Sequence, residues 1–204
     1  MKLHGCKGCG SAAIEALLEL AGAAYERPIF DWDDKAAWDR LRTINPLAQV
    51  PTLVTDDGTV MTESAAIALW LADRHPDAAL LPQAEAARAS AYRWIVSLAT
   101  NTYATIIVGD FPDRWVDGEA AQTSLKAHAL ERLKAGWTQF EASVAPSPYL
   151  AGDAIGALDV YAAMISRWRP GRAWIVEHCP KIAASLAKTE AHPVVASVWG
   201  RNFA

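Results

Sequence analysis

The hydrophobic pattern of the chain changes near residue 80, and this change constrains the fold more than any other feature. Before it, short extended segments alternate with amphipathic helical segments in the order βαβαββα. After it, only helical segments recur. Strands interleaved with helices predict a sheet covered by helices, and helices alone predict a bundle. We therefore expect an α/β domain at 1–76, a linker at 77–85 and an all-α helical-bundle domain at 86–204.

The segments of the first half have recognisable boundaries. In the first helix, apolar residues recur at intervals of three and four over 14–21, with Glu15 and Glu19 on the other face. Turn residues at 56–58, between two β-rich runs, indicate a hairpin. The expected strands lie within 1–5, 25–30 and 51–61, the helices within 12–21, 31–45 and 62–76, and the candidate helix caps are Asp33 or Asp34 and Thr62 or Ser64.

The second half is rich in alanine and is punctuated by clusters of proline and glycine. It contains no internal repeat and no low-complexity tract. The expected helices lie at 85–108, 119–144, 158–168 and 181–188.

Composition excludes several classes of protein. The net charge is -4 with acidic and basic residues interspersed, which disfavours a nucleic-acid partner because phosphate binding needs a concentrated basic surface. No apolar run approaches the roughly 18 residues of a membrane span, so no membrane partner is expected. Glu15 and Glu19 interrupt any signal-peptide core. An odd number of cysteines, three, disfavours a disulfide framework, and we expect a cytoplasmic protein with reduced thiols.

Three motifs follow one another along the chain: NPLAQVPTL at 45–53, TESAAIALWLADRHP at 62–76 and YLAGDAIGALDVYAA at 149–163. The first resembles the loop before the cis-proline strand of the cytosolic glutathione transferases. The second resembles the Glu-Ser glutathione-binding turn of that family with its following helix, and the third is similar to the N-capping segment of its helical domain. The resemblance covers the whole chain. It implies a thioredoxin-like N-terminal domain, glutathione as co-substrate and a homodimer.

The third motif departs from the family at one position. Gly156 stands where the family usually has a serine or threonine helix cap, with Asp159 three residues later. Glycine caps a helix acceptably but has no side chain, so half of the capping box is left unmade. We expect this departure to affect stability and not chemistry.

The Val50-Pro51 step is the first expected part of a glutathione site. Proline is the one residue type before which a cis bond is energetically accessible, and the resemblance implies that Pro51 is cis. Val50 would then turn its N–H and C=O outward to pair with a peptide-like ligand by strand addition. The alternative interpretation is an ordinary proline on an edge strand.

Glu63 and Ser64 form the second expected part, where a hairpin strand meets a helix N-terminus. Backbone N–H groups there attract a carboxylate, and Glu63 can pair with an ammonium group. A γ-glutamyl group carries both charges on one carbon. The alternative is a simple helix-capping pair. Lys35 and Gln49 fall where several family members contact the rest of glutathione, although an exposed lysine is usually only solvated.

The residue that acts on sulfur in this family lies between the first strand and the first helix, at 5–11 here. That window contains no tyrosine. The start is nearest to the bacterial beta-class pattern, whose catalytic cysteine would fall on Gly10. We expect Cys9 to form a mixed disulfide with glutathione, because a helix N-terminus stabilises a thiolate. Ser11 ranks second, as a hydrogen-bond donor to the glutathione sulfur, and Cys6 third.

Other interpretations of Cys6-Lys7-Gly8-Cys9 exist. The C-x-x-C spacing is typical of dithiol exchange, and Lys7 would lower the pKa of both thiols. We expect Cys6 to lie too far into the strand to meet Cys9 in that geometry. A zinc site from His4, Cys6 and Cys9 would lack a fourth ligand, so no metal is expected. Cys179 is interpreted as a buried apolar residue.

The helical domain should supply the pocket for the second substrate, a small apolar electrophile or a disulfide. Aromatic residues on helices more often belong to the core, which is the alternative interpretation. The candidates are Tyr103, Phe111, Trp115, Tyr161 and Trp168. We expect a glutathione S-transferase-like enzyme that transfers the thiolate of glutathione to an electrophile or uses it in thiol-disulfide exchange. The alternative is a non-catalytic ligand-binding or protein-interaction module of the same fold.

Overall fold

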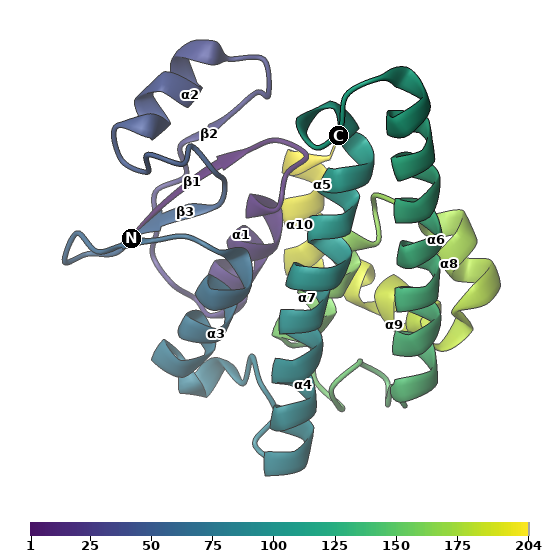
Figure 1. Cartoon of the computed structure of the whole chain (residues 1–204). Helices are drawn as coiled ribbons and strands as arrows, with labels where there is room; N and C mark the ends of the chain where they lie inside the picture. The colour runs from purple at the N-terminus through teal and green to yellow at the C-terminus, as the bar shows by residue number, and fades with distance from the viewer. Residues whose placement is uncertain (204) are drawn as a thin grey trace.

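A four-stranded mixed sheet organises the first half of the chain (Figure 1). In the computed structural model, which describes residues 1–203, its strands are β1 (Lys2–Cys6), β2 (Ile29–Phe30), β3 (Thr52–Val54) and β4 (Val60–Met61). Their order in the sheet is β2-β1-β3-β4. Strand β1 runs parallel to β2 and antiparallel to β3, and β3 pairs antiparallel with β4 across the predicted hairpin.

Three helices complete the predicted βαβαββα order, namely α1 (Ser11–Leu20), α2 (Lys35–Arg42) and α3 (Ser64–Arg74). Helices α1 and α3 pack together, and Figure 1 shows α2 on the other side of the sheet. Leu3 and Leu53, which are paired across β1 and β3, are fully buried in the core with these two helices.

The caps of α2 and α3 differ from each other. The Asp34 carboxylate accepts a hydrogen bond from the Ala37 N–H at 2.9 Å, so Asp34 caps α2 as one of the two residues expected. Helix α3 has Glu63 at its N-cap and no side-chain cap. The prediction of Thr62 or Ser64 is therefore wrong, because the Ser64 hydroxyl is used in a contact with the helical half described below.

The second half is entirely helical. Residues 85–110 form one continuous helical segment, made of α4 (Glu85–Ser97), a π-helical turn (Leu98–Tyr103) and α5 (Ala104–Asp110). This segment matches the helix expected at 85–108. The expected helices at 119–144, 158–168 and 181–188 are also present. The remaining helices are α6 (Glu119–Ser143), α7 (Ala157–Ile165), α8 (Arg172–His178), α9 (Pro180–Ala191) and α10 (Pro193–Asn202), with single 3₁₀ turns at Pro76–Ala78 and Pro112–Arg114.

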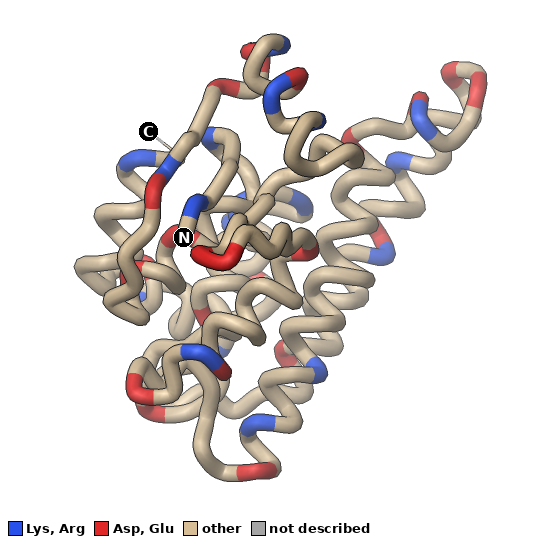
Figure 2. Tube along the Cα trace, turned by 90° about the vertical axis from the view of Figure 1, so that its left-hand side faces the viewer, with Lys and Arg blue, Asp and Glu red and all other residues tan. Residues whose placement is uncertain are grey.

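Helix α7 lies at the centre of the molecule, and each of its residues is buried. It contacts α1 and α3 of the first half and α4 and α9 of the second. One apolar core therefore runs through both halves. The division into 1–76, 77–85 and 86–204 stays a prediction. Charged residues of both signs are interspersed along the chain in the view of Figure 2.

Gly156 marks a close approach between the linker and α7. The Ala157 N–H donates a hydrogen bond to the Leu80 carbonyl oxygen at 2.7 Å, and a Cβ atom on Gly156 would lie 2.7 Å from that same oxygen. The Asp159 carboxylate accepts from the Gly156 N–H at 3.1 Å, which is the half of the capping box that was expected. The linker carbonyl thus occupies the space of the missing cap side chain.

Candidate active site

The segment between β1 and α1 is a tight turn. The Cys9 N–H donates to the Cys6 carbonyl oxygen at 3.2 Å, and Gly8 has a φ of +71°. A positive φ at the third position of a four-residue turn is typical of type II geometry and favours glycine. Cys6 and Cys9 are the first and last residues of this turn, which we call the CKGC turn.

The two thiols of the CKGC turn lie together. The Cys6 Sγ is 3.5 Å and the Cys9 Sγ 3.6 Å from the Lys7 carbonyl oxygen. The neighbouring Cys9 thiol lowers the pKa of Cys6, and the same contact raises the pKa of Cys9. Cys6 is fully buried and Cys9 is partly exposed. The turn folds back on the end of the strand and brings Cys6 close to Cys9, whereas the sequence predicted Cys6 to lie too far into the strand for the usual redox geometry.

Segments from elsewhere in the chain hold the CKGC turn in place. The Gly8 N–H donates to the carbonyl oxygen of Asn202, near the end of α10, at 2.8 Å. The Lys7 N–H donates to the Phe30 carbonyl oxygen at 3.0 Å, and the Lys7 ammonium pairs with Asp31 at 2.9 Å. The turn is thus fixed from both the sheet and the C-terminal helix.

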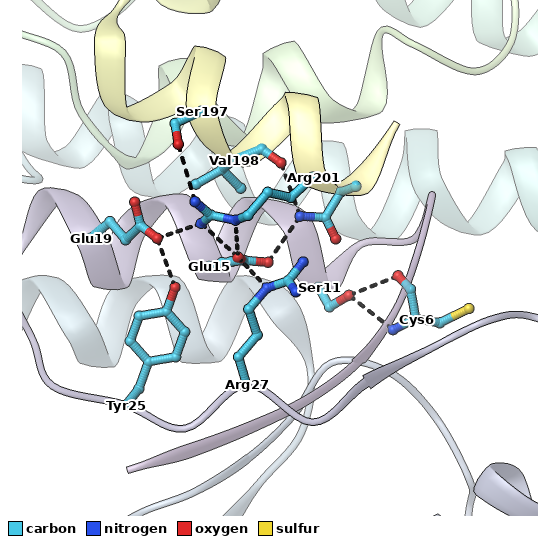
Figure 3. A network of polar contacts seen from close by, with 10 residues as sticks. Cys6, Ser11, Glu15, Glu19, Tyr25, Arg27, Ser197, Val198 and Arg201 are labelled. Atoms are coloured by element: carbon cyan, nitrogen blue, oxygen red, sulfur yellow. Dashed lines mark hydrogen bonds and ion pairs between the residues drawn. The ribbon is translucent and has the colours of Figure 1, made fainter. Parts of the chain in front are cut away.

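A buried carboxylate anchors that C-terminal helix (Figure 3). Glu15 is fully buried and pairs with Arg27 and Arg201, the latter at 2.7 Å. Its second oxygen accepts from the Asn202 amide at 2.9 Å. Two guanidinium groups and an amide compensate the cost of removing the carboxylate from water. Glu15 was expected on the outer face of its helix, but α10 packs over that face.

Ser11 is fully buried at the start of α1 and is hydrogen-bonded within the protein. Its hydroxyl accepts from the Cys6 N–H and donates to the Cys6 carbonyl oxygen, both at 3.2 Å. A Cβ atom on Gly5 would lie 2.5 Å from the Ser11 hydroxyl oxygen, so the site is closely packed. This geometry argues against Ser11 as a donor to a ligand sulfur, and its observed contacts brace the end of β1.

Tyr103 brings a phenol from the helical half to the N-terminus of α1. A Cβ atom on Gly10 would lie 2.8 Å from the Tyr103 hydroxyl oxygen, and the Gly10 N–H interacts with that oxygen. Burial, together with the neighbouring Cys9, raises the pKa of Tyr103, so the phenol stays protonated. Its ring stacks on Trp168 with the centroids 5.0 Å apart. Tyr103 therefore fills the space that any side chain at position 10 would need.

The Val50-Pro51 bond is cis, as the resemblance implied. The Asn45 amide braces the loop by donating to the Gln49 carbonyl oxygen at 3.2 Å and to the Thr52 hydroxyl at 3.0 Å. Within residues 1–203, the N–H and C=O of Val50 make no hydrogen bond. These two groups are available to a ligand, and the role of Val50 and Pro51 in binding stays a prediction.

Glu63 and Ser64 differ in their exposure. Glu63 is exposed and has a φ of +61°, next to the start of α3. The Ser64 hydroxyl is hydrogen-bonded to the Tyr161 hydroxyl at 2.7 Å, which links the two halves of the chain. Tyr161 is fully buried in α7, and burial raises its pKa to about 12. Tyr161 therefore belongs to the core and does not line a pocket.

The remaining predicted residues are exposed or half-buried. Lys35 is exposed at the start of α2, and Gln49 is exposed in the loop before Pro51. Phe111 is half-buried and Trp115 is 60% exposed. Phe111 stacks on Trp32 with the ring centroids 6.4 Å apart, so this pair bridges the two halves. Trp32 was not predicted; it is exposed in the loop before α2 and follows Asp31, which pairs with Lys7 of the CKGC turn.

A model of one known family matches most of the first domain. Residues 11–74 match the model described as Glutathione S-transferase, N-terminal domain. Over 204 residues, the chain is 33% identical to the uncharacterized GST-like protein YncG of Escherichia coli (strain K12), covering 99% of this chain and 98% of that protein. The chain belongs to the glutathione S-transferase family.

Other members of the glutathione S-transferase family share the length and fold of this chain. Glutathione S-transferase GstA of Escherichia coli O157:H7 is 28% identical over 202 residues, covering 96% of this chain and 95% of that protein. The solved structure of a sphingomonad glutathione S-transferase complexed with glutathione is 26% identical, covers 100% of this chain and 99% of that one, and has a TM-score of 0.81. The thioredoxin-like domain implied by the resemblance is confirmed.

Two further properties concern the part of this transferase-family chain that the structure describes. Among residues 1–203, no group of three or more His, Cys, Asp or Glu side chains could hold a metal ion, which includes the combination of His4, Cys6 and Cys9. In the same part of the chain, no helix combines the length and the apolar character needed to cross a bilayer.

Proposed function

We propose that this chain binds glutathione and catalyses glutathione-dependent thiol-disulfide exchange through Cys9. One observation carries the proposal: Cys9 presents a partly exposed sulfur immediately before the N-terminus of α1, whereas the Ser11 hydroxyl is buried and already hydrogen-bonded. A positive helix end favours an anionic sulfur at this position. The glutathione named in the sphingomonad complex supports the choice of ligand.

The proposed glutathione contacts follow from groups with unused hydrogen-bonding capacity. The N–H and C=O of Val50 would pair with the backbone of the tripeptide as an added strand. Exposed Glu63 would pair with the γ-glutamyl ammonium, and the first N–H groups of α3 at Ser64 would bind its carboxylate. Lys35 and Gln49 are proposed to contact the remaining part of the ligand.

The exchange reaction needs one thiolate in the CKGC turn. Contact with Cys9 lowers the pKa of Cys6, so the first proton leaves the Cys6 thiol, and transfer of the Cys9 proton to the Cys6 thiolate then yields the Cys9 thiolate. The Cys9 thiolate attacks a sulfur of a glutathione mixed disulfide and forms a Cys9–glutathione bond, and the other thiol leaves as a thiolate that takes up a proton. The thiolate of a second glutathione then attacks the glutathione sulfur of that bond, releasing glutathione disulfide and Cys9.

Conjugation of glutathione to a small apolar electrophile is a second candidate function. The observation that favours it is the protonated Tyr103 phenol beside Gly10 and Cys9, which could donate a hydrogen bond to the glutathione sulfur. Phe111, Trp115 and Trp32 offer apolar surface for the electrophile. We further propose a homodimer and a cytoplasmic location, the latter because all three cysteines are unpaired thiols.

The experiment pairs two assays on four proteins: reduction of a glutathione mixed disulfide and conjugation of glutathione to a chlorodinitrobenzene. The proteins are the wild type, Cys9→Ser, Ser11→Ala and Tyr103→Phe. We expect Cys9→Ser to lose reduction at least 100-fold, and Tyr103→Phe to keep reduction and lose conjugation. Ser11→Ala should retain reduction.

Calorimetry with glutathione separates binding from chemistry. Glu63→Gln should weaken binding by about tenfold, because one charge-assisted hydrogen bond is lost. Reduction that survives in Cys9→Ser would contradict the exchange mechanism. Glutathione binding without activity in either assay would identify a binding module instead of an enzyme.

A further inference from the structure

We propose that Cys6 and Cys9 form a reversible intramolecular disulfide, with Cys6 as the resolving cysteine that displaces glutathione from Cys9. The redox pair itself depends only on the geometry of the CKGC turn. Its physiological substrate class, mixed disulfides of glutathione, rests on the proposed function. The chain would then exchange two electrons with its substrate through an internal dithiol.

The geometry of the turn brings the two cysteines within bonding range. The hydrogen bond from the Cys9 N–H to the Cys6 carbonyl oxygen closes a four-residue turn, in which the first and last Cα atoms are less than about 7 Å apart. Disulfides join Cα atoms about 4.4–6.8 Å apart. Both sulfurs already lie within 3.6 Å of one atom, the Lys7 carbonyl oxygen, so they point to the same side of the turn.

The difference in burial assigns the two roles. Cys9 is partly exposed and is open to an external disulfide, whereas Cys6 is fully buried and closed to one. Burial of the resolving thiol prevents its direct reaction with an external disulfide, so Cys9 reacts first. Cys179, the third cysteine, is also fully buried and lies in the helical half after α8.

The contacts around the turn let the bond form without rearrangement of the fold. Backbone hydrogen bonds from Gly8 to Asn202 and from Lys7 to Phe30 hold the two residues between the cysteines. None of these contacts uses a cysteine side chain. The Ser11 hydroxyl holds the backbone of Cys6 and leaves its sulfur free to turn toward Cys9.

The reaction balances as two successive exchanges. The Cys9 thiolate attacks a mixed disulfide, a Cys9–glutathione bond forms, and the first thiolate leaves. The Cys6 thiol transfers its proton to a leaving thiolate and attacks the Cys9 sulfur, the Cys6–Cys9 bond forms, and glutathione leaves. The dithiol is oxidised by two electrons and the substrate disulfide is reduced to two thiols. Two further glutathione molecules reverse the process and are released as glutathione disulfide.

The test equilibrates the full-length protein in buffers of reduced and oxidised dithiothreitol, followed by acid quenching, alkylation of thiols under denaturing conditions and intact-mass measurement. We expect the three alkylated thiols of the reduced protein to fall to one in oxidising buffer. Cys179→Ala, the matched control, should fall from two to none at the same buffer ratio. In Cys6→Ser and in Cys9→Ala, the number of alkylated thiols should be the same in reducing and oxidising buffer.

A tryptic map of the wild type keeps the test valid if a variant fails to fold. Trypsin cleaves after Lys7, between the two cysteines. In the oxidised protein, the peptide ending at Lys7 should stay joined to the peptide that contains Cys9, and reduction should separate them. Separate peptides before reduction, or a bond from either one to Cys179, would overturn the proposal.

A parallel titration with glutathione disulfide distinguishes this proposal from the proposed function. Cys6→Ser should accumulate a glutathione adduct on Cys9 that the wild type resolves. An adduct that accumulates equally on the wild type, without an internal disulfide, would overturn the role of Cys6 and leave exchange through Cys9 intact. An internal disulfide in dithiothreitol, from a protein that binds no glutathione, would support the pair and contradict the proposed function.

Discussion

At the scale of single residues, two glycines, Gly8 and Gly10, determine the geometry of the site. Gly8 provides the positive φ that closes the CKGC turn, and Gly10 leaves room for the Tyr103 phenol. The family resemblance points to a cysteine side chain at position 10. In this chain the cysteine lies one residue earlier, at Cys9. The phenol of Tyr103, from the helical half, occupies the space that a side chain at position 10 would fill.

Gly10→Ala tests whether the Tyr103 phenol excludes a side chain at position 10. The new Cβ atom would lie 2.8 Å from the Tyr103 hydroxyl oxygen, so we expect a loss of about 1–3 kcal/mol in the free energy of unfolding, measured in urea. The double variant Gly10→Ala/Tyr103→Phe removes the closest atom and should recover part of the loss relative to Tyr103→Phe. Equal losses in both backgrounds would contradict a clash with the hydroxyl.

The residues of the site were predictable in unequal degree. The cis bond at Pro51 and the position of Glu63 beside α3 follow from local motifs, because the turn and the helix start lie within a few residues of them. The hydrogen bond from Gly8 to Asn202 and the contact of Gly10 with Tyr103 join distant parts of the chain. Nothing local to the sequence signals such pairs.

At the scale of elements, hydrophobic periodicity located most of the helices but missed α8 and α10. Helices α1, α3 and α6 have uninterrupted helical patterns. Helix α8 has only 7 residues, about two turns, and α10 begins with Pro193; no helix was predicted for either segment, although proline is well accommodated at the first helical position.

Helix α10, which was not predicted, stabilises the CKGC turn through the hydrogen bond from Gly8 to Asn202. Replacing Glu15 by Gln leaves Arg27 and Arg201 without their buried anion, so we expect about 3 kcal/mol of destabilisation and faster hydrogen exchange at the Gly8 amide. Glu19→Gln is the matched control, because Glu19 also pairs with Arg201 but is partly exposed; its loss should stay below about 1 kcal/mol. Unchanged hydrogen exchange at the Gly8 amide in Glu15→Gln would show that α10 does not stabilise the CKGC turn.

The start of α7 contains a group that makes stability depend on pH. Burial raises the pKa of Asp159 from its ordinary value of 3.8 to about 6, although the N–H groups of Leu150 and Gly156 oppose the shift. A raised folded pKa means that the contribution of Asp159 is complete below about pH 4 and is lost as the pH rises through about 6. At about 1.4 kcal/mol per pKa unit, we expect a decline of about 3 kcal/mol between these values.

Asp159→Asn isolates that contribution, because asparagine keeps an acceptor and does not titrate. The difference in unfolding free energy between the wild type and Asp159→Asn, measured in urea from pH 4 to pH 7, should shift in favour of the variant as the pH rises. A difference that does not depend on pH would show that Asp159 ionises in the folded protein as easily as in the unfolded chain.

At the scale of the whole molecule, the two halves meet through polar contacts as well as through the shared core. The Ser64 hydroxyl meets the Tyr161 hydroxyl, and the Leu80 carbonyl of the linker caps α7. Because α7 contacts α1, α3 and α4, a disturbance at its start reaches both halves. We therefore expect the chain to unfold as one cooperative unit.

Gly156→Ala tests this dependence at the linker. The added Cβ atom would meet the Leu80 carbonyl oxygen at 2.7 Å, and since that atom belongs to the backbone, the linker must move and the bond to Ala157 must lengthen. We expect a loss of about 2–3 kcal/mol in unfolding free energy, with amides of β1 and of α9 losing protection together. The matched control is Gly136→Ala in α6, where nothing lies within 4 Å of the added atom; there alanine should stabilise the protein by about 0.5–1 kcal/mol. Loss of protection confined to α7 and its helical neighbours would mean that the sheet domain holds its fold independently, and the domain boundary predicted near residue 80 would then also be a boundary of cooperativity.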